Sequence, residues 1–250
     1  PLGQGLGNAV GMAIAEEILK KKFGKNIINN KTYVIASDGD LMEGISHEVM
    51  SLAGHLKLKN LIVFFDNNKI SIDGSTALSV SDNYKKRFEG YGWNFLEING
   101  HNEKQISKAI AKASISKKPS LISCKTIIGY GSPNKSGKSS SHGAPLGDDE
   151  IILARKKLKW KHAPFEIPKE ILSEWRKIGL KGEKLENKWK DNLNKKNPKI
   201  RKELNEIYTD SSIIKLEKLI NKEKSKYFDT KPSLATRQCS SKTIESITSI

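Results

Sequence analysis

The sequence predicts an α/β fold in which a parallel β-sheet is covered by helices on both faces and is followed by a helical connector. Short apolar runs rich in β-branched residues alternate with longer segments whose apolar residues recur at helical spacing. The apolar runs are almost continuous, which is typical of parallel strands buried on both faces. A chain of 250 residues is long enough for one sizeable domain with an extension.

The first half of the chain supplies the predicted sheet and the helices that cover it. We expect strands at 32–36, 61–65, 93–98 and 120–126, and helices at 8–21, 44–56 and 103–116. In the last of these helices Ile106, Ala109, Ile110 and Ala113 fall on one stripe. Residues 127–148 are rich in Gly, Ser and Pro and have no periodicity, so we expect a long loop, which inside a domain is usually functional or disordered.

The composition changes again after this loop, and we expect three parts. Residues 1–165 form the α/β domain, residues 166–230 form a connector of Lys-, Glu- and Asn-rich helices, and residues 231–250 begin a further domain. The chain does not begin with Met and stops within a helical pattern, so we expect it to be a piece of a longer protein.

The net charge of +16 raises the question of nucleic-acid binding. The basic residues are almost all Lys, with Arg only at 87, 155, 176, 201 and 237, and they are spread along the chain. Nucleic-acid sites favour clustered Arg, so we expect no nucleic-acid partner, although the positive field would attract sugar phosphates.

The cysteines and the hydropathy bear on the compartment of the protein. Cys124 and Cys239 form neither a disulfide framework nor a metal cluster, so we expect a reducing, cytoplasmic setting. No apolar run reaches the roughly 18 residues of a membrane span, so we expect no membrane partner.

Polar clusters follow two of the predicted strands. Asp38 comes after the strand at 32–36, and Asn68 comes after the strand at 61–65, 30 residues later. This spacing fits one strand–helix–strand unit, and ligands of such sheets bind at the carboxyl ends of the strands. We therefore expect Asp38 and Asn68 to lie side by side at that edge.

These two side chains are hard oxygen donors, which suit Mg²⁺ or Ca²⁺. Mg²⁺ takes about six oxygens, which could come from Asp38, Asn68, one backbone carbonyl, a diphosphate and water. Gly39 would let the backbone approach that anion, and the following helix presents its N-terminus to it. Alternatively, each cluster only caps a helix or makes a turn, and the pairing at matched strand ends is what favours an ion.

The motif of Asp-Gly followed about 30 residues later by Asn resembles the binding motif for thiamine diphosphate (ThDP), and the surrounding sequence resembles the transketolase family. The resemblance is dense over residues 1–168 and returns briefly near the end of the chain. It is carried by PLGQGLGNAVGMAIAE (1–16), DLMEGISHEVMSLAGHLKLKNLIVFFDNNKISIDG (40–74), KPSLISCKTIIGYGSPNK (118–135), SHGAPLGDDEI (141–151), APFEIP (163–168) and LATRQCS (234–240).

The resemblance implies a ThDP-binding fold and a transferase activity. A transketolase moves a two-carbon ketol (glycolaldehyde) unit from a ketose phosphate to an aldose phosphate in the pentose phosphate pathway, with ThDP and Mg²⁺, and acts as a homodimer. Residues 1–165 would then be the domain that binds the ThDP diphosphate and Mg²⁺, without its N-terminal part. Residues 231–250 would begin the pyrimidine-binding domain. We expect the isolated 250-residue chain to be inactive, because family members carry further active-site residues outside this stretch.

The resemblance also assigns residues around the cofactor. Asp38, Asn68 and the carbonyl of Ile70 correspond to the metal ligands, and Gly39 and Asn68 to contacts with the diphosphate. Three further positions correspond to residues that lie beside the cofactor, with Ile72 near the thiazolium: Pro1, Leu2 and Ile72.

Three more positions correspond to functional residues of the family. His142 corresponds to a catalytic histidine that reaches both the cofactor and the substrate, and histidine can transfer protons to sugar oxygens near neutral pH. Arg237 corresponds to the arginine that binds the substrate phosphate, which its bidentate fork suits. Glu43 corresponds to a glutamate that links the subunits. Outside the family context these residues would be a solvated histidine, a surface arginine and a helix N-terminal charge.

Two residues depart from the family pattern. Ser37 stands where the family usually has glycine, and a positive φ there would strain it. Asp40 adds a negative charge near the expected diphosphate, which would weaken anion binding unless the side chain points away or faces a cation.

The sequence is also compatible with other functions. The chain could be one half of a split enzyme, or a non-catalytic ThDP-binding module that needs a partner chain. It could also belong to another ThDP enzyme, such as a dihydroxyacetone synthase or a deoxyxylulose-phosphate synthase, although the SHGAPLGD segment (141–148) disfavours the latter.

Overall fold

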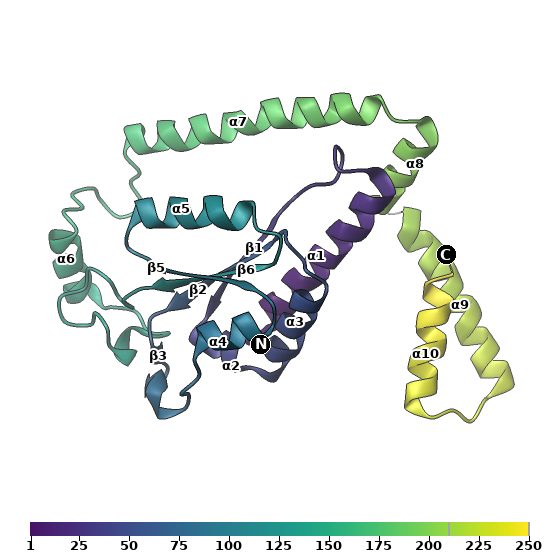
Figure 1. The fold of residues 1–250 in the computed structure, drawn as a ribbon, viewed down its shortest axis with the longest axis horizontal. Helices are drawn as coiled ribbons and strands as arrows, with labels where there is room; N and C mark the ends of the chain where they lie inside the picture. Colours follow the sequence, from purple (N-terminus) through teal and green to yellow (C-terminus); the bar gives the residue numbers. More distant parts are fainter. Residues whose placement is uncertain (210, 250) are drawn as a thin grey trace. The chain divides into compact units, whose positions relative to one another are not determined.

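The computed structural model describes residues 1–209 and 211–249. The chain forms two compact units, Pro1–Lys181 and Gly182–Ile250. The first unit contains the β-sheet (Figure 1). Its bounds include all the predicted site residues except Arg237. The domain boundaries expected at 165/166 and 230/231 stay predictions.

The first unit is built on a four-stranded parallel sheet in the order β1-β2-β6-β5. The pairing register places Ser37, the last residue of β1, beside Asp66 of β2. The carboxyl ends of the strands therefore meet at one edge, as predicted. The strands are β1 (Thr32–Ser37), β2 (Leu61–Asn67), β5 (Asn94–Asn99) and β6 (Ser120–Lys125).

Helices cover both faces of this sheet, which confirms the predicted fold class (Figure 1). Leu61, Val63 and Phe65 of β2 pack into the core beneath the helices of one face. Ile62 points to the other face and packs with α5, because successive strand residues alternate between faces. The first face carries α1 (Gln4–Phe23), α2 (Asp38–Met42), α3 (Gly44–His55) and α4 (Tyr84–Gly90), and the second carries α5 (Glu103–Ser114).

Some elements differ from the sequence expectation. Helix α1 begins at Gln4, four residues before the expected start, because the burial of Leu6 outweighs the low helix propensity of Gly5 and Gly7. Helices α2 and α4 were not expected, since five and seven residues are too short to show a periodic pattern. Further short elements are β3 (Ile70–Ser71), β4 (Gly74–Ser75), the 3₁₀ turns η1 (Thr76–Leu78) and η2 (Ser139–Ser141), and α6 (Asp148–Lys157).

The described residues after α6 are mostly helical, as the composition predicts. Helix α10 begins at Thr236, within the stretch 231–250 that we expect to begin a further domain, and residue 250 lies outside the described residues. Within the part of the chain that the structure describes, no helix has the length and apolar character needed to cross a bilayer. The helices are α7 (Lys169–Asn194), α8 (Pro198–Ile207), α9 (Ser211–Thr230) and α10 (Thr236–Ile247).

Candidate functional site

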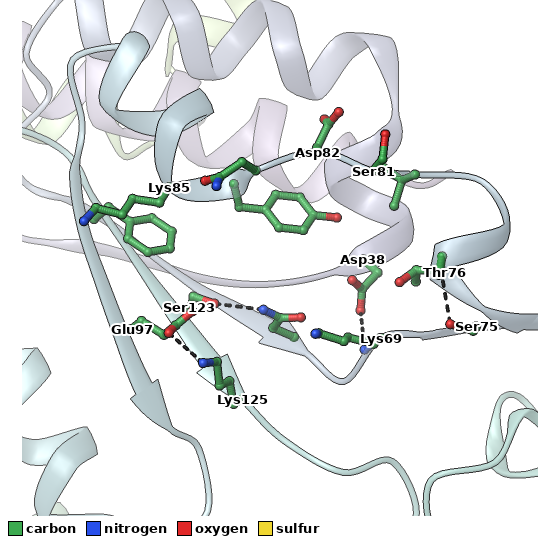
Figure 2. Close-up of a pocket in the computed structure, with 16 residues that line it drawn as sticks. Asp38, Lys69, Ser75, Thr76, Ser81, Asp82, Lys85, Glu97, Ser123 and Lys125 are labelled. Carbon is green, nitrogen blue, oxygen red and sulfur yellow. Dashed lines mark hydrogen bonds and ion pairs between the residues drawn. The ribbon is translucent and has the colours of Figure 1, made fainter.

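Asp38 lies at the tip of β1, where the chain passes directly into α2. Its side chain is buried, with 2% of the residue exposed, and its carboxylate turns toward the segment that follows β2. Asp38 Oδ2 accepts a hydrogen bond from the Lys69 backbone N–H over 3.3 Å (Figure 2). The two polar clusters, 30 residues apart in sequence, therefore meet in space. We call residues 37–40 and 66–70 the strand-tip region.

Asn68 forms a local turn at the end of β2. Its Oδ1 accepts from the Ile70 backbone N–H over 2.9 Å, and its Nδ2 donates to Asp66 Oδ2 over 3.2 Å. Because an amide oxygen has two lone pairs, Asn68 Oδ1 keeps one acceptor position besides this bond. The turn brings the side chain of Asn68 and the backbone of Ile70 to the place where Asp38 contacts Lys69.

The electrostatics of this place suit a cation. Burial raises the pKa of Asp38 to about 6, and the negative charge of Asp66 adds to this effect, while the backbone N–H groups of Lys69 and Asn68 oppose it. Among the described residues, Asp38 forms no salt bridge with a basic side chain. A divalent ion would offset both the burial and the repulsion.

The donor set is consistent with a hard cation rather than a soft one. The described residues contain no group of three or more His, Cys, Asp or Glu side chains that could hold a metal. An ion in the strand-tip region would therefore depend on one carboxylate, one amide oxygen and backbone or ligand oxygens. Such a partial set fits Mg²⁺, which is commonly completed by phosphate oxygens and water.

The two departures from the family pattern are accommodated without strain. Ser37 has φ −103°, an ordinary extended conformation, so no glycine is required there. Asp40 Oδ2 accepts from the backbone N–H and the hydroxyl of Ser37, both over 2.9 Å, and Oδ1 accepts from the Gly3 N–H over 3.0 Å. Burial opposes the charge of Asp40, but these hydrogen bonds lower its pKa. The carboxylate thus ties the first residues of the chain to α2.

This tie brings further predicted residues to the strand tips. A Cβ atom on Gly39 would lie 3.2 Å from Leu2 Cδ1, so the Leu2 side chain lies over the backbone of Gly39. Pro1 precedes it, and its carbonyl accepts from the Gln4 N–H over 3.4 Å. Glu43 lies at the junction of α2 and α3 and is exposed.

A pocket of ≈ 680 Å³ opens beside Asp38 (Figure 2). Two residues that the sequence did not single out, Asn67 and Tyr84, also line it. Asn67 donates to Ser123 Oγ over 3.1 Å, but its Oδ1 is buried without a partner among the described residues, as is the hydroxyl of Tyr84. Burial raises the pKa of Tyr84, and the charge of Asp38 adds to it. Asn67 could have been found from the strand period, since it follows Phe65 by two residues on the same face; Tyr84 had no comparable signal.

The remaining predicted residues are not joined to Asp38. Ile72 lies in the turn between β3 and β4 with 69% of its surface exposed, and His142 is exposed directly after η2. Among the described residues neither side chain hydrogen-bonds to Asp38 or Asn68. Arg237 is exposed on α10 in the second unit.

Comparisons with known proteins relate this chain to transketolases. The family model described as "Transketolase, thiamine diphosphate binding domain" matches residues 1–212. A transketolase of Buchnera aphidicola is 49% identical over 98% of this chain and 38% of its own length. Transketolase 2 of Escherichia coli is 55% identical over 76% of this chain and 29% of its own length. A solved transketolase from Campylobacter jejuni superposes with a TM-score of 0.79 at 42% identity, over 82% of this chain and 32% of that one. The chain thus spans less than two fifths of the length of these relatives.

Proposed function

This chain belongs to the transketolase family, and we propose that it provides the cofactor-anchoring part of an enzyme that transfers a two-carbon ketol unit from a ketose phosphate to an aldose phosphate. The region matched is the family's ThDP-binding domain. The observation that carries the proposal is the buried carboxylate of Asp38 against the turn at 68–70. An anionic group that has no basic partner in the described part of the chain is suited to a metal that tethers a diphosphate.

The proposed ion is Mg²⁺, with Ca²⁺ as an alternative of the same ligand chemistry. Asp38, Asn68 and the backbone carbonyl of Ile70 would hold it. Support comes from the hydrogen bond between Asp38 and the Lys69 backbone and from the unused acceptor position of Asn68 Oδ1. The diphosphate of ThDP would complete the ion, with Gly39 close to its oxygens and Pro1 and Leu2 beside it.

The other assignments concern the reacting end of the cofactor. When bound, ThDP supplies a carbanion that accepts the two-carbon unit. Ile72 would give an apolar contact near the thiazolium, and His142 would exchange protons with sugar oxygens. Arg237 would bind the substrate phosphate, and Glu43 would contribute to the link between subunits. The exposure of Ile72 and His142 leaves both side chains available for such contacts.

The proposal extends to the setting of the whole protein. We place it in the pentose phosphate pathway of the cytoplasm, as a homodimer that takes sugar phosphates and has no nucleic-acid or membrane partner. Residues 1–165 would serve as the diphosphate-binding domain, 166–230 as a connector and 231–250 as the start of the pyrimidine-binding domain. The similarity to transketolases over 98% of the chain favours this function over dihydroxyacetone synthase.

Titration calorimetry of the 250-residue chain with ThDP tests the anchoring role. We expect binding that requires Mg²⁺ and that disappears in Asp38→Ala. Asp73→Ala is a matched control, because Asp73 is an exposed aspartate in the nearby turn between β3 and β4. Binding that is equal without metal, or that persists in Asp38→Ala, would contradict the proposed anchor.

A further inference from the structure

The segment that carries His142 is ordered by side chains rather than by regular secondary structure. Residues 127–148, which we call the His142 loop, contain the short 3₁₀ turn η2 and end at the first residue of α6. Its start is fixed by His101, whose Nε2 accepts from the Ile127 N–H over 3.0 Å and whose ring stacks on Tyr130. The residues that follow Tyr130 are fixed by hydrogen bonds to two charged side chains.

Glu150, on the first turn of α6, is the first of them. It is buried, with 7% of the residue exposed, and its Oε1 accepts from the Ser132 hydroxyl and from the Asn134 N–H, the latter over 2.8 Å. Its Oε2 accepts from Asn134 Nδ2 over 2.9 Å. These hydrogen bonds lower the pKa of Glu150 to about 2, so the carboxylate stays charged and fixes the turn at 132–135.

Lys135 ends that turn and is tied to both sides of His142. Its ammonium donates to the carbonyl of Leu146 over 2.8 Å, four residues after the histidine. Its own carbonyl accepts from the Ser141 hydroxyl over 2.6 Å, one residue before the histidine. The Lys135 N–H in turn donates to Ser132 Oγ over 3.1 Å, which connects these contacts to Glu150.

The start of the loop, at Gly129, packs closely against Ser141 near its other end. A Cβ atom on Gly129 would lie 2.7 Å from Ser141 Oγ, so the backbone there leaves no room for a side chain. Ser141 is therefore enclosed between Gly129 and Lys135, while the next side chain, His142, is exposed. The contacts fix the backbone on both sides of the histidine and leave its imidazole accessible.

We propose that Lys135 and Glu150 are positioning residues, which set the place of the His142 imidazole through Ser141 and Leu146. Neither is proposed to touch the cofactor or the substrate. This proposal rests on the proposed function only in the catalytic role that it gives to His142. The order that the two residues impose on the loop is a property of the chain itself and can be measured without any ligand.

The test uses the 250-residue chain with ¹³C-labelled histidine, observed by NMR. The imidazole signal of His142 is assigned by its loss in His142→Gln. In Lys135→Met we expect this signal to move to its position in the urea-unfolded chain. The signal of His47 in α3, whose Nδ1 hydrogen-bonds with the Tyr91 hydroxyl, should stay in place. Lys138→Met is the matched control, since Lys138 is an exposed lysine of the same loop whose ammonium makes no hydrogen bond or ion pair among the described residues.

Two further variants keep the test decisive. Lys135→Arg retains a cationic donor and should restore the His142 signal, and Ser141→Ala should move it without altering any charge. An unchanged His142 signal in both Lys135→Met and Ser141→Ala overturns the positioning role. A displaced signal supports it, even if the unmodified chain fails to bind ThDP with Mg²⁺ by calorimetry, a failure that would count against the proposed function alone.

Discussion

The strand-tip region and the His142 loop would both serve one cofactor, yet they are held in place by different means. Asp38 and Asn68 stand at the ends of paired, buried strands, so the register of β1 and β2 fixes where they lie. His142 follows a long irregular segment whose order comes from hydrogen bonds to Lys135 and Glu150. The first region depends on the packing of the whole sheet and the second on a few polar side chains.

This difference implies different sensitivities. A change that disturbs the core should affect the strand-tip region together with the global fold, since a packed domain unfolds cooperatively. A change in the His142 loop should alter that loop while the sheet remains intact, as is expected for a segment with few buried apolar contacts. Four predictions test this contrast, from the largest effect to the smallest.

The largest effect on stability should come from adding a side chain at a tightly packed position of α3, one of the helices that cover the sheet. A Cβ atom at Gly54 in α3 would overlap the carbonyl oxygen of Tyr91, so Gly54→Ala should lower the free energy of unfolding by about 3 kcal/mol or more. The Cβ atom of Gly44→Ala in the same helix would meet no atom of the described residues within 4 Å, so this variant should be neutral or slightly stabilising. Urea denaturation followed by circular dichroism measures both. Equal stability of the two variants would show that α3 can shift away from Tyr91.

A smaller and local effect should follow from crowding the loop. Gly129 and Gly143 have φ of +63° and +70°, so alanine at either position should be strained by about 1–2 kcal/mol. A Cβ atom on Gly129 would meet Ser141, whereas one on Gly143 would meet no atom within 4 Å in the part of the chain that the structure describes. Amide hydrogen exchange should therefore show a larger loss of protection for residues 128–146 in Gly129→Ala than in Gly143→Ala, with unchanged protection in β2. If β2 exchanged faster as well, the loop would not be separable from the sheet.

The contrast also explains what the sequence could predict. Nearly continuous apolar runs such as 61–65 identified the buried strands, and the topology of a parallel sheet then brought Asp38 and Asn68 to one edge. No similar rule applied to residues 127–148, because side-chain hydrogen bonds across 16 or 18 positions, as between Glu150 and Asn134 or Ser132, leave no periodic pattern. The position of His142 within the loop could therefore not be predicted from the sequence. His142 was identified as a candidate only because the segment around it resembles the family.

The geometry of the two residues that depart from the family pattern was likewise not predictable from the sequence. A positive φ would have strained Ser37, and Asp40 would have weakened anion binding unless its side chain pointed away or faced a cation. The sequence alone could not decide either point, because it does not give φ or the direction of a side chain. In the structure the two residues hydrogen-bond to each other, and Asp40 also holds Gly3. A pair of substitutions that each look unfavourable can thus form a single capping arrangement at the start of α2.

The third prediction concerns the buried charge of the strand-tip region. Asp38→Asn keeps the shape of the side chain but removes a carboxylate that is disfavoured by burial and by Asp66. In the absence of metal we expect the free energy of unfolding at pH 7 to rise by about 1–2 kcal/mol once solvent screening is allowed for. Mg²⁺-dependent ThDP binding should be lost in the same variant. The control is Asp73→Asn, which should change neither quantity, and a destabilised Asp38→Asn would mean that the carboxylate serves the fold rather than a ligand.

The smallest effect is the pH response of the His142 loop. Because Ser132 and Asn134 hold the pKa of Glu150 near 2, its carboxyl ¹³C signal should stay constant from pH 6 to pH 3 in the folded chain and titrate near 4.3 in urea. Because the pKa of Glu150 is lower in the folded chain than in the unfolded chain, its charged carboxylate stabilises the fold at pH values above the unfolded pKa. This stabilisation is lost as the pH falls from about 4.5 toward 2. In Glu150→Gln the loop should lose this acid sensitivity while the sheet keeps its own. Titration of Glu150 near 4.3 in the folded chain would show that its hydrogen bonds do not hold the turn at 132–135 in solution.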